Sequence, residues 1–383
     1  MKLRHIDGTP ALLKPHQLRS SVSAYLSTKK GRQDMRIAQI APLHEAVPPK
    51  LYGGTERVVS YLTEELVDMG HDVTLFASGD SITKAKLNAA WPQALRLDPS
   101  LRDRLAPQFL LLEKVYEHAH EFDVLHFHID YFPASLFSRQ NTPFLTTLHG
   151  RLDLPELGPV YSNLPPQNIV AISESQSRPL REANFIATVH HGLPVNLLRP
   201  QPGPQDYVAF LGRICPEKRA DRAISIARQA GVRLKLAAKI DAVDADYHAQ
   251  VIAPMLGPDA ELIGEISDRE KSSFLSGAKA LLMPIDWPEP FGLVMIEAMA
   301  CGTPVIAYDH GSVPEIIEDG VTGFIVKNEQ EAVAALKKAE ELDRKLIRQR
   351  FEVRFSARRM AQDYVKTYES LLAIGRRKLR LVQ

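Results

Sequence analysis

The sequence predicts an α/β protein with two Rossmann-like domains that face each other across a cleft. Short, almost continuously apolar segments alternate with segments of helical period, which is typical of parallel strands covered by helices on both faces. A proline-rich segment at 192–206 interrupts this alternation once, and the pattern then starts again. The length of 383 residues also suits two domains.

The composition is that of an ordinary globular protein, with 45% hydrophobic and 24% charged residues and a net charge of +1. This balance excludes a disordered chain and a strongly basic nucleic-acid-binding protein, so we expect no nucleic-acid partner. The two cysteines, Cys215 and Cys301, are too few for a disulfide framework or a cysteine-based zinc site. We expect them to be buried in a cytoplasmic protein. No apolar run approaches the roughly 18 residues that a transmembrane helix needs.

Residues 1–34 precede the first convincing strand, and we expect them to form a poorly ordered extension. Basic residues outnumber acidic ones there, and the segment lacks both a sustained apolar period and the apolar core of a secretory signal. A translation start at Met35 is the second explanation that remains open. A targeting or lipid-binding role is the less favoured alternative.

The first domain is predicted at 35–200. Its first strand is predicted at 36–41, and Gly53 and Gly54 lead into an amphipathic helix that ends at Gly70. The further strands of this domain are predicted at 72–77, 124–128, 144–149, 169–173 and 186–190. Their alternation with helical segments implies a doubly wound parallel sheet.

The second domain is predicted at 201–355, after the semi-rigid linker that the prolines of 192–206 indicate. Its strands are predicted at 207–211, 233–238, 261–264, 280–284 and 304–307. A long helical stretch at 357–374 follows, and we expect the region 356–383 to cross back to the first domain. Ligands of such sheets lie at the carboxyl ends of the strands, which places the site in the cleft between the domains.

The segment 288–297 carries the clearest chemical pattern. Pro290 and Gly292 indicate a turn, and a helix is predicted to begin near Leu293 with its free N–H groups and positive dipole end available to an anion. Glu289 comes just before this helix and Glu297 about one turn into it, where both carboxylates suit hydrogen bonds from sugar hydroxyls. The alternative is that Glu289 caps the helix and Glu297 is a solvated helix position.

A second pattern lies where the first strand of the second domain ends. Gly212 and Arg213 end the strand, and Lys218 falls in the first turn of the next helix. Two cations at such a corner suit a diphosphate. The alternative is that both are ordinary surface residues.

These patterns together resemble the retaining GT-B glycosyltransferases of family 4. The segment 289–297 is similar to the Glu-x7-Glu motif of that family, and 212–218 matches its Gly-Arg-x4-Lys element. The segments 298–305, 311–315 and 319–323 match in kind and order. In the first half, Gly53-Gly54 resembles the glycine loop of the family and Leu148-His149-Gly150 its active-site histidine. The resemblance covers residues 35–375.

The resemblance implies transfer of a hexose from a nucleotide diphosphate sugar to a hydroxylated acceptor. A UDP-sugar is favoured over a GDP-sugar as the donor, and the acceptor is a small molecule, a sugar or a lipid-linked molecule. The family implies retention of configuration by front-face attack, with no metal and no other cofactor. A non-catalytic sugar- or nucleotide-binding protein of the same fold, or a GT-B phosphorylase, is the alternative.

The resemblance also implies a role for each matched residue. Glu289 and His149 would contact the transferred sugar as catalytic residues, and Glu297 would bind the ribose. The remaining donor-binding residues, which would hold the diphosphate through side chains or backbone N–H groups, are Gly54, Arg213, Lys218, Phe291, Gly292 and Leu293.

Further polar residues are weaker candidates. Asp130 and Glu174 are acceptor-side candidates near the expected cleft edge. Asp244-Ala245-Asp246 matches the Asp-x-Asp metal motif, but we interpret it as the cap of a helix at 247–256. His126 and His128 share one strand face, and without a third ligand at suitable spacing we interpret them as core or cleft-edge residues.

Two more alternatives concern cofactor and membrane. An NAD-dependent oxidoreductase would need Gly-x-Gly-x-x-Gly after a strand, and neither 53–55 nor 212–214 fits. The basic residues at 376–380 could reach the inner face of a membrane, which would give at most peripheral contact. We favour a solvated helix end for them.

Overall fold

The computed structural model describes residues 34–50, 53–203 and 206–382. The predicted extension at 1–34 lies outside these ranges except for its last residue. The side chains of 375–383, on which the membrane alternative depends, are outside the description as well.

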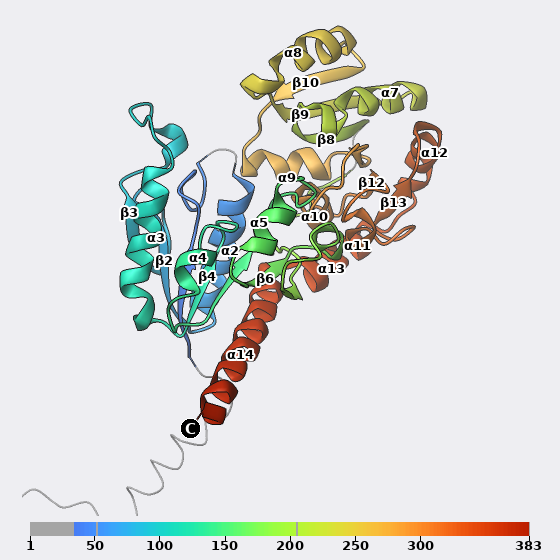
Figure 1. Cartoon of the computed structure of the whole chain (residues 1–383). Helices are drawn as coiled ribbons and strands as arrows, with labels where there is room; N and C mark the ends of the chain where they lie inside the picture. Colours follow the sequence, from blue (N-terminus) through green and yellow to red (C-terminus); the bar gives the residue numbers. More distant parts are fainter. Residues whose placement is uncertain (1–33, 51–52, 204–205, 383) are drawn as a thin grey trace, which may run out of the picture.

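The first sheet has seven parallel strands in the order β3-β2-β1-β4-β5-β6-β7 (Figure 1). The strands are β1 Arg36–Ile40, β2 Asp72–Ser78, β3 Lys86–Trp91, β4 Val124–Phe127, β5 Phe144–Thr147, β6 Asn168–Ala171 and β7 Phe185–Thr188. All six predicted strands are confirmed to within a few residues. The edge strand β3 was not predicted, because it is largely exposed and mixes polar with apolar residues.

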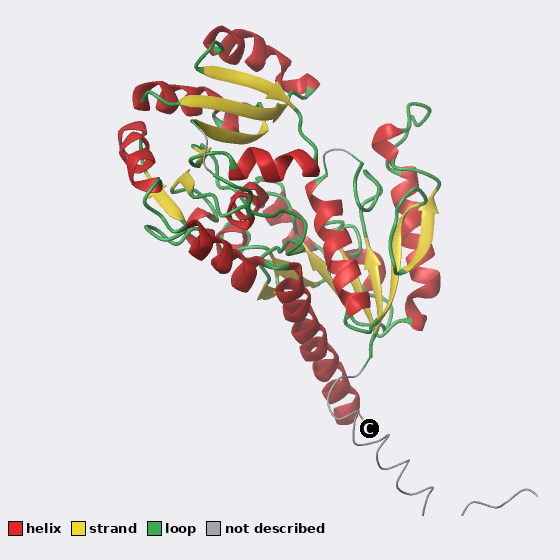
Figure 2. Ribbon diagram, turned by 180° about the vertical axis from the view of Figure 1, so that it is seen from behind, coloured by secondary structure: helices red, strands yellow, loops and turns green. Residues whose placement is uncertain are grey.

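The helices of this half pack against both faces of its sheet (Figure 2). They are α2 Gly54–Asp68, α3 Ala106–His118, α4 Ala134–Phe137, α5 Leu157–Asn163 and α6 Glu174–Ser177, with 3-10 turns η1 Leu95–Leu97 and η2 Ala119–Glu121. Helix α2 buries one face that includes Val58, Leu62 and Leu66, as its helical period predicts.

The second sheet has six parallel strands in the order β10-β9-β8-β11-β12-β13. The strands are β8 Tyr207–Arg213, β9 Arg233–Lys239, β10 Ala260–Gly264, β11 Leu281–Met283, β12 Val305–Tyr308 and β13 Gly323–Val326. The five predicted strands are confirmed. The sixth, β13, is a short edge strand that the sequence analysis did not identify.

The helices of the second half are more numerous and shorter. The longer ones are α7 Ala220–Ala230, α9 Asp268–Ser276, α10 Leu293–Ala300, α12 Glu329–Ala339 and α13 Arg344–Phe355. The short ones are η3 Pro216–Lys218, η4 Ala242–Asp244, α8 Ala245–Tyr247, the π turn η5 His248–Ile252, η6 Ala253–Met255 and α11 Val313–Ile316. The helix predicted at 247–256 is therefore a succession of short turns.

The chain crosses between the two halves twice, and the two crossing segments lie next to each other. The Leu193 N–H donates to Phe355 O at 2.9 Å, and the Ala357 N–H donates to Leu193 O at 2.8 Å. The outgoing linker and the returning segment thus lie side by side. From there α14 Ala357–Val382 runs along the first domain and packs against α2 (Figure 1). The predicted return helix is confirmed and is longer than expected.

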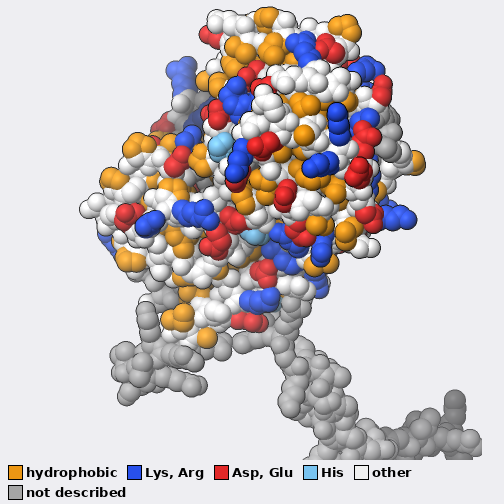
Figure 3. All heavy atoms as spheres, turned by 90° about the vertical axis from the view of Figure 1, so that its right-hand side faces the viewer, with side chains coloured by type: hydrophobic (Ala, Val, Ile, Leu, Met, Phe, Trp, Pro, Cys, Tyr) orange, Lys and Arg blue, Asp and Glu red, His pale blue; other side chains and the backbone are white. Residues whose placement is uncertain are grey.

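One hydrophobic core runs through both halves. It joins α2, α10, α13 and α14, and it includes Phe291, Phe355 and Tyr368. On the face drawn in Figure 3, basic and acidic side chains are interspersed, in keeping with the near-zero net charge. Among the helices that the structure describes, none combines the length and apolar character needed to cross a membrane.

Candidate active site

The predicted helix start in the second domain is present. Strand β11 leads into a bend that ends at Gly292, whose φ of 78° lies in the left-handed region, and α10 begins at the next residue, Leu293. The N-cap residue is Gly292, and within the described residues the helix start has no side-chain cap hydrogen bond. The alternative that Glu289 caps this helix is therefore wrong. The first N–H groups of α10 lie at the carboxyl end of the sheet, where helix starts bind anions.

The turn after β12 holds the loop that carries Glu289. At Gly311 (φ 60°), a Cβ would lie 2.3 Å from the Glu289 N and 2.4 Å from the Glu289 O. The Ser312 N–H donates to Glu289 O at 2.9 Å, and the Ser312 hydroxyl donates to Phe291 O at 2.8 Å. Only a residue without a side chain at 311 lets the two backbones approach this closely.

Glu289 is 8% exposed and lies between two donors. The Lys218 ammonium forms an ion pair with its Oε2, and the Trp287 indole N–H donates to the same oxygen at 3.1 Å. The ammonium also lies 5.0 Å from the centroid of the Trp287 ring. The structure therefore brings Lys218 and Glu289 together, and it adds Trp287, which the sequence analysis did not single out.

Glu297 is 4% exposed, so the alternative of a solvated helix position is wrong. The Lys271 ammonium on α9 donates to Glu297 Oε1 at 2.7 Å and lies 3.4 Å from Asp268 Oδ1. Burial favours the neutral amine, but the charge of Glu297 and its hydrogen bond raise the pKa of Lys271. Asp268 also pairs at 2.5 Å with Arg57 of α2, which connects this cluster to the first domain.

Arg213 lies at the end of β8 among acidic side chains. Its Nη1 is 3.4 Å from Asp241 Oδ2 and 3.8 Å from Asp244 Oδ2. The hydrogen bond from Lys239, with the charges of Lys239 and Arg213, lowers the pKa of Asp241. Asp244 makes no side-chain hydrogen bond that caps the following helix. The predicted cap is therefore wrong: the carboxylate of Asp244 is directed toward a cation instead.

His149 follows β5 and lies against two other histidines. Its Nε2 is 2.9 Å from His128 Nδ1, and its ring stacks on that of His191 with centroids 5.2 Å apart. The His191 ring in turn packs edge-on against Phe291, at 4.9 Å. Burial lowers the pKa of His149 to about 3, so the imidazole is neutral at pH 7. His149 of the first domain is thus connected, through His191, to Phe291 in the Glu289 loop of the second domain.

The glycine loop meets the start of α10. Gly54 begins α2, and a Cβ on it would lie 3.8 Å from Leu293 Cδ1. Residues 51–52, just before this loop, lie outside the described ranges. The structure thus brings Gly54 together with the predicted donor-binding residues of the second domain.

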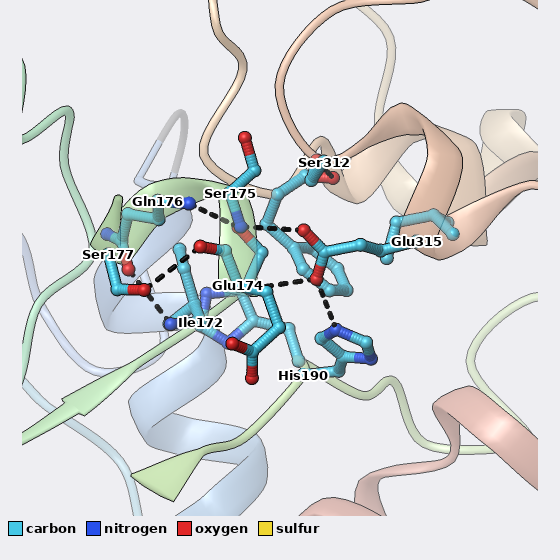
Figure 4. A network of polar contacts seen from close by, with 12 residues as sticks. Ile172, Glu174, Ser175, Gln176, Ser177, His190, Ser312 and Glu315 are labelled. Atoms are coloured by element: carbon cyan, nitrogen blue, oxygen red, sulfur yellow. Dashed lines mark hydrogen bonds and ion pairs between the residues drawn. The ribbon is translucent and has the colours of Figure 1, made fainter. Parts of the chain in front are cut away.

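The two acceptor-side candidates are both exposed. Asp130 is exposed, with a φ of 49°. Glu174 is exposed and begins α6, and its N–H and that of Ser175 donate to the carboxylate of Glu315 on α11 at 2.8 and 2.7 Å (Figure 4). His190 Nε2 lies 3.2 Å from the same carboxylate. Glu315, which the sequence analysis noted only as part of a motif, therefore joins the two domains.

Ser173 caps α6 by accepting a hydrogen bond from the Gln176 N–H at 3.0 Å. Its hydroxyl donates to Pro290 O in the Glu289 loop at 2.6 Å, which is a second contact between this end of α6 and the second domain.

His126 on β4 and His128, just after this strand, are both buried, as expected for core residues. His126 Nε2 lies 2.8 Å from Thr147 Oγ1, and His128 Nε2 lies 2.8 Å from Gln39 Oε1. Within the described ranges, no three His, Cys, Asp or Glu side chains gather as a set of metal ligands.

Two family models match the chain, one in each half. The model described as Glycosyltransferase Family 4 matches residues 52–187, and the model described as Glycosyl transferases group 1 matches residues 199–353.

Curated relatives match over part of their length. A D-inositol 3-phosphate glycosyltransferase of Mycobacterium avium is 32% identical over 37% of this chain and 37% of its own length. An alpha-maltose-1-phosphate synthase of Mycolicibacterium smegmatis is 28% identical over 41% of this chain and 46% of its own. The match thus spans less than half of each relative.

Solved structures match nearly throughout. A glycosyltransferase involved in avilamycin A biosynthesis is 23% identical with a TM-score of 0.66, covering 88% of this chain and 98% of its own. Sucrose-phosphate synthase from Thermosynechococcus elongatus is 20% identical with a TM-score of 0.71, covering 89% and 100%. Anabaena HepE, solved with UDP-glucose, is 19% identical with a TM-score of 0.66, covering 88% and 100%. At these identities the likeness concerns the fold.

The contact between Gly311 and the Glu289 backbone generates a prediction. Gly311→Ala should lower the free energy of unfolding by about 1–3 kcal/mol more than Gly320→Ala, because it adds overpacking to a strained backbone. Gly320 is the matched control: its φ is 72°, and a Cβ there would meet nothing within 4 Å. Denaturant unfolding measures both variants, with Trp287 fluorescence in a Trp91→Phe background as the probe of the loop. Equal losses for the two variants would contradict the close contact.

Proposed function

This chain belongs to the family-4 glycosyltransferases of the GT-B fold, and on that premise we propose that it transfers a hexose from a nucleotide diphosphate sugar to a hydroxylated acceptor. The contact of Lys218 and Glu289 beside the uncapped start of α10 is the observation that carries the proposal. It joins a cation for phosphate, a carboxylate for sugar hydroxyls and an anion site in one place.

The diphosphate is held by the cations of the second domain and by backbone N–H groups. A lysine ammonium has three donors, so Lys218 can keep its contact with Glu289 while it donates to a phosphate oxygen. Arg213 supplies the second charge. The remaining donors to the diphosphate are the backbone N–H groups around Phe291, Gly292 and Leu293 and that of Gly54 in the first domain. These donors stabilise the negative charge that develops on the leaving nucleotide, without a metal ion or other cofactor.

The nucleoside and the sugar are bound by the two buried carboxylates. Lys271 occupies Oε1 of Glu297, and no hydrogen bond reaches Oε2 from the described residues, which leaves that oxygen for a ribose hydroxyl. Glu289 and His149 contact the transferred hexose. A UDP-sugar is the favoured donor over a GDP-sugar, and the Anabaena relative solved with UDP-glucose supports that choice. The acceptor is a small molecule, a sugar or a lipid-linked molecule.

The reaction retains the anomeric configuration by front-face attack. The bond between the anomeric carbon and the donor phosphate breaks, and the acceptor oxygen forms a new bond on the same face. The acceptor proton passes to a phosphate oxygen of the leaving nucleotide. This description follows the family, because the sequence marks no residue as the nucleophile that a double-displacement mechanism needs.

Loss of either diphosphate cation should reduce turnover. Arg213→Ala and Lys218→Ala should each lower kcat by about 10²-fold, the scale of losing one contact to developing charge. Lys279→Ala is the control, because Lys279 pairs with Glu340 at the surface and should leave kcat unchanged. A change confined to KM in the first two variants would show that these cations bind only the ground state.

Replacing each of the two carboxylates should change a different property, nucleotide affinity in one case and kcat in the other. Glu297→Gln should mainly weaken nucleotide binding, whereas Glu289→Gln should lower kcat steeply and leave binding of the free nucleotide diphosphate near the wild-type level. The reason is that Glu289 meets the reacting sugar, where positive charge builds, and contacts realised in the transition state appear in kcat. Calorimetry with UDP, beside turnover of UDP-glucose, measures both. The opposite pattern would reverse the assignment.

Turnover should not depend on a divalent metal. With excess EDTA the rate should stay within about threefold of the control, because Arg213, Lys218 and the start of α10 already neutralise the diphosphate. A large loss that magnesium or manganese restores would contradict this expectation.

A further inference from the structure

A chain of buried hydrogen bonds connects His149 to α14. His149 Nε2 contacts His128 Nδ1 at 2.9 Å, and His128 Nε2 contacts Gln39 Oε1 at 2.8 Å. The Gln39 amide then donates to the Tyr368 hydroxyl at 3.1 Å, which lies 2.7 Å from His126 Nδ1. Gln39, His126, His128 and Tyr368 are all buried. We refer to His149, His128, Gln39, His126 and Tyr368 as the relay.

In the structure the nitrogen of the Gln39 amide faces Tyr368 of α14, and its oxygen faces His128. Tyr368 accepts from the amide and has one proton to give, which goes to His126 Nδ1. His126 then carries its proton on Nε2 and donates it to Thr147 Oγ1 at 2.8 Å. The Thr147 hydroxyl lies 2.9 Å from that of Tyr364, also on α14. Every contact thus has one donor and one acceptor when the amide nitrogen faces α14 and its oxygen faces His128.

This orientation determines which nitrogen of each histidine carries a proton. Burial lowers the pKa of His128 well below its ordinary value, and that of His149 to about 3, so both rings are neutral with one N–H each. An amide oxygen only accepts, so the proton of His128 is on Nε2 and its Nδ1 holds the lone pair. His149 must therefore donate from Nε2, and its lone pair is on Nδ1.

The His149 Nδ1 is buried and has no hydrogen-bond partner among the described residues. The ring that carries it stacks on His191, which packs against Phe291 of the Glu289 loop. A buried polar atom without a partner is unfavourable, and a ligand that donates a hydrogen bond to it would relieve this cost.

We propose that Gln39 and His128 are positioning residues that hold His149 as the Nε2–H tautomer, so that its Nδ1 accepts a hydrogen bond from a hydroxyl of the transferred sugar. The tautomer follows from the orientation of the Gln39 amide in the relay, whereas the identity of the donor hydroxyl rests on the proposed function. In this tautomer the Nδ1 of His149 can only accept a hydrogen bond, so the sugar group that faces it must be a donor.

Nitrogen-15 NMR of the imidazole side chains tests the tautomer without any substrate. In the wild-type protein at pH 7, long-range proton–nitrogen correlations should show His149 with an unprotonated Nδ1 and a protonated Nε2, assigned by comparison with His149→Gln. A His149 protonated on Nδ1 would overturn the inference, and this result would leave the proposed transfer reaction standing.

Two variants separate positioning from general packing. Gln39→Met removes the amide oxygen and should give a mixture of His149 tautomers with a kcat about tenfold lower, the loss of about 1.4 kcal/mol, and unchanged affinity for UDP. Thr147→Val is the matched control: it breaks the network beyond His126 and leaves the contacts of His128 in place. It should keep the wild-type tautomer. An unchanged tautomer in Gln39→Met would overturn the role of Gln39.

Titration with nucleotides tests the contact with the sugar. UDP-glucose should move the His149 Nδ1 resonance to lower nitrogen-15 shift, as expected when a lone pair accepts a hydrogen bond, and UDP alone should not. An Nδ1 resonance unmoved by UDP-glucose at a concentration that saturates transfer would refute the contact. If UDP-glucose and GDP-glucose are neither bound nor turned over while the tautomer is as stated, the proposed donor fails and the assignment of the tautomer stands.

Discussion

The close approach of two backbones at Gly311 positions most of the candidate site. This contact, with the hydrogen bonds from Ser312, fixes the loop 288–292 against the turn that follows β12. Glu289 takes its place from that loop, and so does the start of α10. Phe291 carries the constraint to His191, and Pro290 O accepts from Ser173 of the first domain. Because the second domain holds this loop in place, the loop can stay rigid where it contacts the first domain.

Charged groups in the site come as opposite pairs. Lys218 pairs with Glu289, Lys271 with Glu297 and Arg57 with Asp268. Partly buried ion pairs of this kind add little net stability, because each ion has lost much of its hydration. Their value is geometric, since each partner fixes the direction of the other. The diphosphate would thus meet cations that are already held at the mouth of the site, and little of its binding energy would be spent on ordering long side chains.

Local sequence patterns predicted the regular architecture and the residues that belong to compact motifs. Buried parallel strands are continuous apolar runs, which is why those of the sheet interiors were found and the edge strands β3 and β13 were missed. Glu289, Glu297 and Lys218 lie in short segments with turn residues that mark them. Lys271, Trp287 and Gln39 carry no such mark, because their partners come from other elements. Asp244 was assigned to a helix cap on local grounds, while its cation lies 31 residues earlier in the chain.

Helix α14 makes the first domain discontinuous in the sequence. Tyr364 and Tyr368 complete the polar network beneath its sheet, yet they follow the whole second domain along the chain. A chain that emerges from the ribosome in order presents β1 to β7 long before these two hydroxyls. Until then Gln39, His126 and Thr147 lack their final partners in an otherwise apolar layer. Helix α14 therefore completes the support of the histidine at the site, so that a chain released before α14 is made would form two sheets without setting the polarity of that ring.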